Sequence, residues 1–276
     1  MDYLRIIRPV NALMAAATVL AGFLISFQGI YFEFSGLAML MLSALFITAY
    51  GNVINDIFDI DIDKSNRPDR PLPSGSISTK SASIFCFLLL LAGLVSARFA
   101  GVVYFKTASA IAVMLWIYSA YLKSTALWGN MLVALLSAIT VVYGAHFAGD
   151  PYYAVWPALF AFLLHLAREI VKDMADVEGD QAVGCKTLPI RFGMRSSASI
   201  VIGILAMLLG ILPIPWRDGL YSRTYLILIV LTVLPPVLYT VLKLLRGFEN
   251  RDLKIMSGAL KFAMVSGIAA VLLGKG

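Results

Sequence analysis

The sequence predicts an all-α membrane protein whose chain crosses the bilayer nine times. Of its 276 residues, 60% are hydrophobic and only 14% are charged, whereas soluble domains carry roughly 25% charged residues. Apolar stretches of about 20 residues, each long enough to cross a ~30 Å hydrocarbon core as a helix, recur along the whole chain. Because a helix satisfies its backbone hydrogen bonds internally, these stretches predict a single transmembrane domain over residues 1–276.

Nine such stretches can be separated by the charged or turn-forming residues between them. They cover residues 10–28, 35–54, 82–99, 101–122, 126–149, 152–170, 198–215, 221–244 and 255–273. Only the corner at residues 98–101 separates the third stretch from the fourth. One merged helix there is the alternative, and it would reverse the orientation of every later segment.

The distribution of basic residues supports nine spans with a cytoplasmic N-terminus. Lys and Arg gather in the cytoplasmic loops of membrane proteins. In this topology 16 of the 22 basic residues are cytoplasmic and five are external, while Lys261 lies within the last span. The net charge of +6 then describes a cytoplasmic face that attracts anionic lipids and phosphorylated substrates, and so apolar a chain is a poor partner for nucleic acid. We expect a multi-pass protein of the cell membrane.

The two cysteines and the two histidines are expected to be structural. Cys86 lies within a span and Cys185 in a cytoplasmic loop, so they predict neither a disulfide nor a metal site. His146 and His165 are isolated within spans. This placement favours packed or hydrogen-bonded side chains over residues that line a pocket.

Nine of the 16 carboxylates fall in two short segments, each of which continues a predicted span out of the membrane. Both segments contain the pattern D-x-x-D-x-x-x-D. At a constant offset of 117 residues, Asp56, Asp59 and Asp63 match Asp173, Asp176 and Asp180, and Asn52 matches Glu169. Four predicted spans separate the copies. The match indicates an internal duplication of approximately residues 1–125 and 126–245 followed by a ninth helix, with convergence as the alternative.

The spacing of these aspartates indicates a bound cation. Carboxylates at i, i+3 and i+7 share one face of a helix. At ~6 Å and an effective dielectric of ~20, each like-charged pair costs on the order of 3 kcal/mol. Oxygen ligands at a helix end fit Mg²⁺, whose shell is commonly completed by phosphate oxygens. Two facing clusters therefore predict that the six aspartates hold Mg²⁺ and a diphosphate. Solvated loop charge is the alternative, and it is retained for Asp61 and Glu178.

Basic and aromatic residues next to the aspartates are candidates for binding phosphate. Arg67 and Arg70 follow the first aspartate segment in a proline-rich loop, and a guanidinium can bind phosphate oxygens bidentately. Lys172 adjoins Asp173, although it points a different way around the helix. The fourth span ends with Tyr118, Tyr121 and Lys123. A lysine there could bind phosphate while a tyrosine ring shields a developing cation, although tyrosine is also commonplace at membrane interfaces.

These motifs resemble the signature of the UbiA superfamily of intramembrane prenyltransferases. The resemblance covers the whole chain. It depends on the segments Asn55-Asp56-x-x-Asp59-x-x-x-Asp63, Arg67-Pro-x-Arg70-Pro-x-Pro-Ser-Gly75, Asp173-x-x-Asp176-x-x-x-Asp180 and Gly184-x-x-Thr187-Leu-Pro189. It implies a helical bundle around a central cavity, which opens to the cytoplasm under cap-like loops and sideways to lipid, with a tunnel for an isoprenoid tail.

Within that superfamily, residues 65–71 and 168–173 are most similar to the digeranylgeranylglyceryl phosphate synthases of archaeal ether-lipid biosynthesis. The similarity implies Mg²⁺-dependent transfer of a geranylgeranyl group from geranylgeranyl diphosphate to geranylgeranylglyceryl phosphate, a step of phospholipid biosynthesis. Two alternatives stay open. One is prenylation of an aromatic acceptor in a quinone or pigment pathway, and the other, from a different class, is a divalent-cation transporter.

The resemblance assigns roles to three groups of residues. The expected catalytic residues are Asp56, Asp59, Asp173, Asp176, Lys123 and Tyr118. The expected substrate-binding residues are Asn52, Asn55, Arg67, Arg70, Tyr121, Lys172 and Glu169, with the two asparagines orienting metal ligands. The expected metal ligands are Asp56, Asp59, Asp63, Asp173, Asp176 and Asp180. A prenyl diphosphate, a glyceryl phosphate lipid acceptor and membrane lipids are the expected partners, and the oligomeric state is left open.

Overall fold

The computed structural model describes residues 2–275, apart from the side chains of Ser65 and Asn66. Within that range the chain is helical, and its one β-type feature is an isolated bridge between Tyr221 and Lys275. The part described contains nine helical segments long and apolar enough to cross a membrane. The predicted fold class and the predicted number of spans are confirmed.

The nine spans are built from long helices, some of which continue into a short turn of different pitch. In chain order they are α2 (Pro9–Ser26), α3 (Phe34–Phe58), α5 (Thr79–Ala100), α6 (Val102–Ile117) with η1 (Tyr118–Leu122), α7 (Trp128–Phe147), η2 (Pro151–Ala154) with α8 (Val155–Ala175), α11 (Met194–Ile211) with α12 (Ile214–Arg217), α13 (Arg223–Leu228) with η3 (Ile229–Val233) and α14 (Leu234–Arg246), and α15 (Asn250–Leu273). Four short helices lie between or before them: α1 (Asp2–Ile6), α4 (Ile60–Asn66), α9 (Val177–Ala182) and α10 (Leu188–Phe192).

The chain turns between the third and fourth spans, and the two helices do not merge there. Gly101 separates α5 from α6 with φ 143° and ψ 161°, a conformation open to glycine but strained for other residues. The merged-helix alternative is therefore wrong. The orientation of every later span follows from this break.

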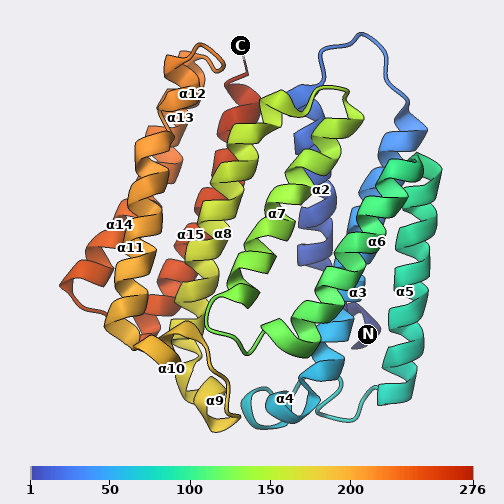
Figure 1. Cartoon of the computed structure of the whole chain (residues 1–276), viewed down its shortest axis with the longest axis vertical. Helices are drawn as coiled ribbons and strands as arrows, with labels where there is room; N and C mark the ends of the chain where they lie inside the picture. Colours follow the sequence, from blue (N-terminus) through green and yellow to red (C-terminus); the bar gives the residue numbers. More distant parts are fainter. Residues whose placement is uncertain (1, 276) are drawn as a thin grey trace.

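Both segments that carry aspartates lie at the same end of the bundle. Short helices α4 and α9 contact each other and lie together at the lower end in Figure 1, where the N-terminus also lies. The C-terminus lies at the opposite end, as an odd number of crossings requires. The carboxylates thus gather at one end of the bundle. A divalent-cation transporter, the alternative from another class, would be expected to carry its carboxylates near the middle of the bilayer, so this placement does not match it.

The bundle has two main apolar cores, one on each side of the pair α2 and α7. One core is built largely from α3, α5 and α6, and the other largely from α8, α11, α13, α14 and α15. Helices α2 and α7 cross closely, because Gly22 lies against the carbonyl of Val141 and Gly144 against the carbonyl of Val19. A side chain at either glycine would clash with backbone, so this contact depends on small residues.

Candidate active site

Each aspartate segment lies where a long spanning helix bends into a short one. We call Asp56, Asp59 and Asp63 the first motif and Asp173, Asp176 and Asp180 the second motif. The bend falls at the middle aspartate of both, with φ −90° and ψ 2° at Asp59 and φ −100° and ψ 7° at Asp176. Each motif therefore spans a bend rather than one continuous helix, because the chain turns where it leaves the apolar region. Helices α3 and α8 also extend past the predicted limits of residues 54 and 170.

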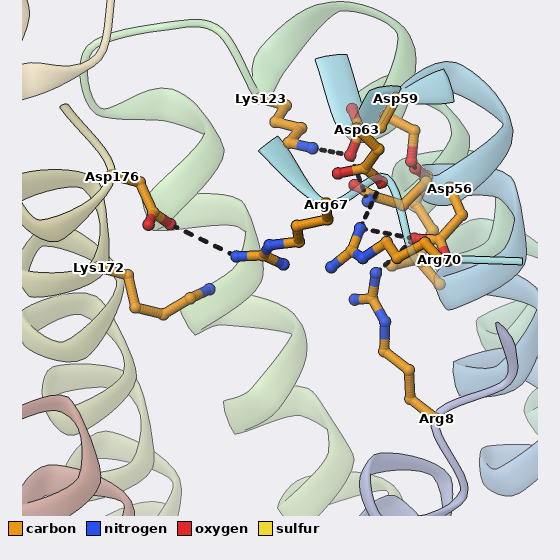
Figure 2. A network of polar contacts seen from close by, with 12 residues as sticks. Arg8, Asp56, Asp59, Asp63, Arg67, Arg70, Lys123, Lys172 and Asp176 are labelled. Carbon is orange, nitrogen blue, oxygen red and sulfur yellow. Dashed lines mark hydrogen bonds and ion pairs between the residues drawn. The ribbon is translucent and has the colours of Figure 1, made fainter. Parts of the chain in front are cut away.

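The first motif is buried and fully paired with cations. Its three aspartates are only 4–5% exposed. Asp56 is paired with Arg8 and lies 3.4 Å from Arg70, which also bonds Asp63 at 2.5 Å. Lys123 is paired with Asp59. Figure 2 shows these cations converging on the three carboxylates from the turn before α2, from the loop after α4 and from the turn after η1.

The second motif is more open and has fewer charged partners. Asp173 accepts a hydrogen bond of 2.7 Å from the Asn130 amide, and the half-exposed Asp176 lies 3.9 Å from Arg67. Burial raises the pKa of the Asp180 carboxyl, and the nearby charge of Asp176 raises it further. A carboxyl with a raised pKa gains by accepting a cation.

Arg67 connects the two motifs. It follows α4, near the end of the first motif, yet its guanidinium points across to Asp176 on the other side of the site (Figure 2). Backbone contacts add to this connection, because the Lys186 amide donates to the Ser124 carbonyl at 2.8 Å and so joins the loops after α9 and η1. The two motifs therefore share one opening.

Both motifs line a single cavity of ≈1300 Å³. Its mouth is charged, and its inner end lies among apolar side chains of the spans. The predicted residues that line it are Asn52, Asn55, Asp59, Asp63, Arg67, Arg70, Tyr118, Tyr121, Lys123, Glu169, Lys172, Asp173, Asp176 and Asp180. The inner lining includes Ile47, Leu115, Leu136, Phe160, Val233 and Ile268. Asp56 is absent from the lining because Arg8 and Arg70 cover it.

The turn η1 sets the position of the predicted tyrosine and lysine. It is a π-helical turn, in which the Lys123 amide donates to the Tyr118 carbonyl at 3.0 Å. Such turns often occur at functional sites. Tyr118 lines the cavity, whereas Tyr121 is 64% exposed and packs edge-on against Trp116 at the rim. Of the two tyrosines, Tyr118 is therefore the one placed inside the site.

Of the remaining predicted polar residues, some hydrogen-bond an aspartate and others hydrogen-bond the backbone or another charged side chain. The Asn55 amide donates to Asp59 at 2.7 Å, as expected for a residue that orients a ligand. The Asn52 amide instead donates to the Ile7 carbonyl at 2.8 Å and fixes the N-terminal segment. Glu169 is buried and bonds Arg168 at 2.9 Å and Lys172 at 2.7 Å. Lys172 lines the cavity, although it points a different way around the helix from Asp173.

Several residues of the site carried no clear signal in the sequence. Arg8 and Asn130 bond Asp56 and Asp173 from 48 and 43 residues away. Arg8 is the one non-glycine residue in the described range with positive φ, at 50°, a strained conformation typical of functional positions. His165 and Cys185, for which the sequence favoured structural roles, line the cavity.

The residues of the two motifs fit Mg²⁺ by donor type, because the side chains are carboxylates and lack competing thiolate or imidazole ligands within the motifs. Among the described residues, no three Asp, Glu, His or Cys side chains lie close enough together to hold a metal ion. The first-motif carboxylates are held instead by Arg8, Arg70 and Lys123. Of the two residues set aside as solvated, Asp61 bonds Lys64 at the surface, while Glu178 lies at the cavity rim.

A family model supplies the decisive comparison. The UbiA prenyltransferase family model matches residues 15–266 of the chain. The chain belongs to the UbiA prenyltransferase family. Two of its relatives in that family are named digeranylgeranylglyceryl phosphate synthase. The protein from Methanopyrus kandleri is 40% identical over 82% of each chain, and the one from Saccharolobus solfataricus is 36% identical over 99% of this chain and 96% of its own.

Solved structures of UbiA proteins share the fold. A structure of digeranylgeranylglyceryl phosphate synthase is 30% identical, covers 99% of this chain and 97% of its own, and superposes with a TM-score of 0.81. A UbiA homologue from Archaeoglobus fulgidus, solved bound to DMAPP and Mg²⁺, superposes with a TM-score of 0.65 at 21% identity over 98% of this chain and 99% of its own. The predicted membership of this prenyltransferase family is confirmed.

Proposed function

We propose that this UbiA prenyltransferase transfers a geranylgeranyl group from geranylgeranyl diphosphate to geranylgeranylglyceryl phosphate and forms digeranylgeranylglyceryl phosphate for archaeal ether lipids. The observation that carries the proposal is the single cavity that joins both aspartate motifs at a charged mouth to an apolar interior. A prenyl diphosphate likewise has a charged diphosphate head and an apolar isoprenoid tail. The names of the relatives at 36–40% identity supply the acceptor.

The six motif aspartates would hold Mg²⁺, which when bound neutralises charge on the diphosphate leaving group. The chain's own cations add to this. Arg67 and Lys123 line the mouth and can stabilise the negative charge that develops on the bridging oxygen as the allylic C–O bond breaks. Asn55 holds Asp59 and Asn130 holds Asp173, so each motif has an aspartate with fixed orientation.

The apolar interior protects the reacting carbon from water. Tyr118 lines the cavity, where its ring face can stabilise positive charge on the allylic carbon. The hydroxyl oxygen of the acceptor forms the new C–O bond. Its proton passes to a carboxylate at the mouth or to the released diphosphate, and water is kept from competing with the acceptor.

Transfer of radiolabel tests this function. The purified protein in nanodiscs is incubated with Mg²⁺, labelled geranylgeranyl diphosphate, and either geranylgeranylglyceryl phosphate or a hydroxybenzoate acceptor. We expect label in digeranylgeranylglyceryl phosphate and none in the aromatic product. Transfer to the aromatic acceptor alone would contradict the proposal.

The motif-bearing end is proposed to face the cytoplasm of a cell membrane, because most basic residues lie at that end. Cys185 lines the cavity mouth while Cys86 is buried. A membrane-impermeant maleimide should therefore label the protein in inside-out vesicles and not in right-side-out vesicles. Cys185→Ser should abolish the labelling, and equal labelling in both preparations would contradict the orientation.

An internal duplication of approximately residues 1–125 and 126–245, followed by a ninth helix, is proposed as the origin of the two motifs. The equivalent bends at Asp59 and Asp176 support it. A family-wide comparison of the two halves tests it, and similarity restricted to the aspartates would favour convergence.

A further inference from the structure

A group of basic side chains lines the cavity on the wall formed by α8 and α15. Helix α15 contributes Lys254 and Lys261, which are seven residues apart and therefore lie on one face, two turns from each other. Helix α8 contributes Arg168 and Lys172, and all four residues line the cavity. This wall is distinct from the α3 side, where the first motif lies (Figure 1).

Lys261 lies deep within its span. The start of α15 is level with the end of α8, because the Asn250 amide donates to the Ala175 carbonyl at 2.9 Å. Eleven residues further on, Lys261 lies about 16 Å along the helix axis, level with His165 on the antiparallel α8. Side chains lean toward the N-terminus of their helix, so the ammonium group of Lys261 leans back toward the mouth. An ionisable residue at such depth is costly and usually functional.

The positive charge of this wall is not balanced by its carboxylates. Glu169 bonds both Arg168 and Lys172. Within residues 2–275, neither Lys254 nor Lys261 forms an ion pair with a carboxylate, and Arg168 Nε has no hydrogen-bond partner. The cations of the α3 side, in contrast, are already paired with the first motif. An anionic ligand on the α8 and α15 wall would balance this excess.

We propose that Lys261, aided by Arg168, binds the phosphate of the glyceryl phosphate acceptor and thereby selects a phosphorylated acceptor, while Lys254 adds positive charge nearer the mouth. This inference rests on the proposed function, and it places the two anionic groups of the reaction at different positions in the cavity. The donor diphosphate lies between the two motifs, and the acceptor phosphomonoester lies against α8 and α15. A flexible lysine supplies a point charge for such a phosphate. An acceptor without a phosphate would gain nothing from it.

The experiment compares Lys261→Met with the wild-type protein, using geranylgeranylglyceryl phosphate and its dephosphorylated form, geranylgeranylglycerol, as acceptors. A charge-assisted contact predicts that Lys261→Met raises the KM for the phosphorylated acceptor about 10- to 100-fold. The KM for the donor and the slow rate with the dephosphorylated acceptor should stay unchanged. Lys261→Arg, which retains the charge, should restore most of the preference. Lys106→Met, an exposed lysine of α6 outside the cavity lining, serves as the matched control.

Two results would overturn the role of Lys261. One is an equal loss of rate with both acceptors, and the other is a raised KM for the donor at an unchanged KM for the acceptor. Thermal unfolding of each variant shows whether a loss of rate reflects misfolding, and Lys261→Arg then decides. A wild-type protein that transfers no label to geranylgeranylglyceryl phosphate would instead refute the proposed function itself, so the two failures are distinguishable.

Discussion

The two aspartate motifs share their spacing and their bend but differ in their partners. The first motif is buried, at 4–5% exposure, and three cations pair with its three carboxylates. In the second motif, Asp176 is half exposed, and the one cation paired with it among the described side chains is Arg67, at 3.9 Å. Asp173 has a neutral amide as its partner. The same three-carboxylate pattern therefore lies in two different electrostatic environments.

This difference indicates two roles for the cations of the first motif, which are to neutralise its buried carboxylates and to lie where a diphosphate would bind. A buried carboxylate needs a partner at all times, because leaving it unpaired costs several kcal/mol. Arg70 and Lys123 supply that partner and lie at the cavity mouth, within the region a diphosphate would occupy. The second motif needs less neutralisation, since water reaches Asp176. We therefore expect the second motif to be the more accessible entry point for Mg²⁺.

The largest expected effect is a loss of activity when an aspartate of either motif is replaced. Asp59→Asn and Asp176→Asn occupy equivalent positions, and each removes a negative charge from the proposed metal site. We expect each to lower kcat/KM by at least ~10²-fold, measured by transfer of labelled geranylgeranyl group. Asp61→Asn changes a surface residue that bonds Lys64; it is the control and should keep full activity. Wild-type activity in Asp176→Asn would show that the second motif has no role in the reaction.

The second prediction separates the motifs by stability. Arg70→Met leaves Asp63 buried without its partner and should destabilise the protein by about 3 kcal/mol. Arg67→Met removes a contact between half-exposed groups and should cost less than ~1 kcal/mol. Thermal unfolding in detergent measures both. Equal shifts in Tm would mean that burial does not distinguish the two motifs.

The sequence predicted most of the fold because membrane spans have strong local signals. Nine apolar stretches could be read directly, although a merged helix at residues 98–101 stayed open as an alternative, and nine spans are present in the described residues. The ends of α3 and α8 were placed too early, since an apolar window stops at residues 54 and 170 while the helices continue through polar residues. The bends at Asp59 and Asp176 carried no separate signal.

The site was predicted as far as its residues form local patterns. The repeated aspartates, Arg67 and Arg70 lie in local motifs, and Lys123 follows the end of a predicted span. All of them except the covered Asp56 line one cavity. Arg8 and Asn130 were missed as partners because they meet Asp56 and Asp173 only through packing of distant helices. An asparagine within an otherwise apolar span was the one available hint for Asn130.

The third prediction concerns the amides that hold one aspartate in each motif. Asn55→Ala and Asn130→Ala remove hydrogen bonds of 2.7 Å to Asp59 and Asp173. Loss of such orienting contacts should weaken Mg²⁺ affinity about 10- to 100-fold, measured as the Mg²⁺ dependence of transfer. Asp59 retains Lys123, whereas Asp173 retains no charged partner among the described residues. The effect should therefore be larger for Asn130→Ala, and the reverse order would contradict the comparison.

The smallest expected effect is a pH dependence specific to the second motif. Burial and the charge of Asp176 raise the pKa of Asp180, so the folded protein favours the protonated form of this carboxyl over a wider range than the unfolded chain. Its contribution to folding is therefore unfavourable above that pKa and disappears as pH falls through it. Because Mg²⁺ binds the ionised form, its affinity should weaken as pH falls through the same window. Asp180→Asn should remove this part of the pH dependence, which Mg²⁺ titrations at several pH values would measure.

The measurement that tests the shared site most directly is a structure with Mn²⁺ and an unreactive geranylgeranyl thiolodiphosphate. Anomalous scattering locates the metal independently of the carboxylates. We expect metal density contacting residues of both motifs, with the diphosphate between α3 and α8 and the isoprenoid chain in the apolar interior. Metal and diphosphate bound by one motif alone, or outside the cavity, would contradict a single site formed by both.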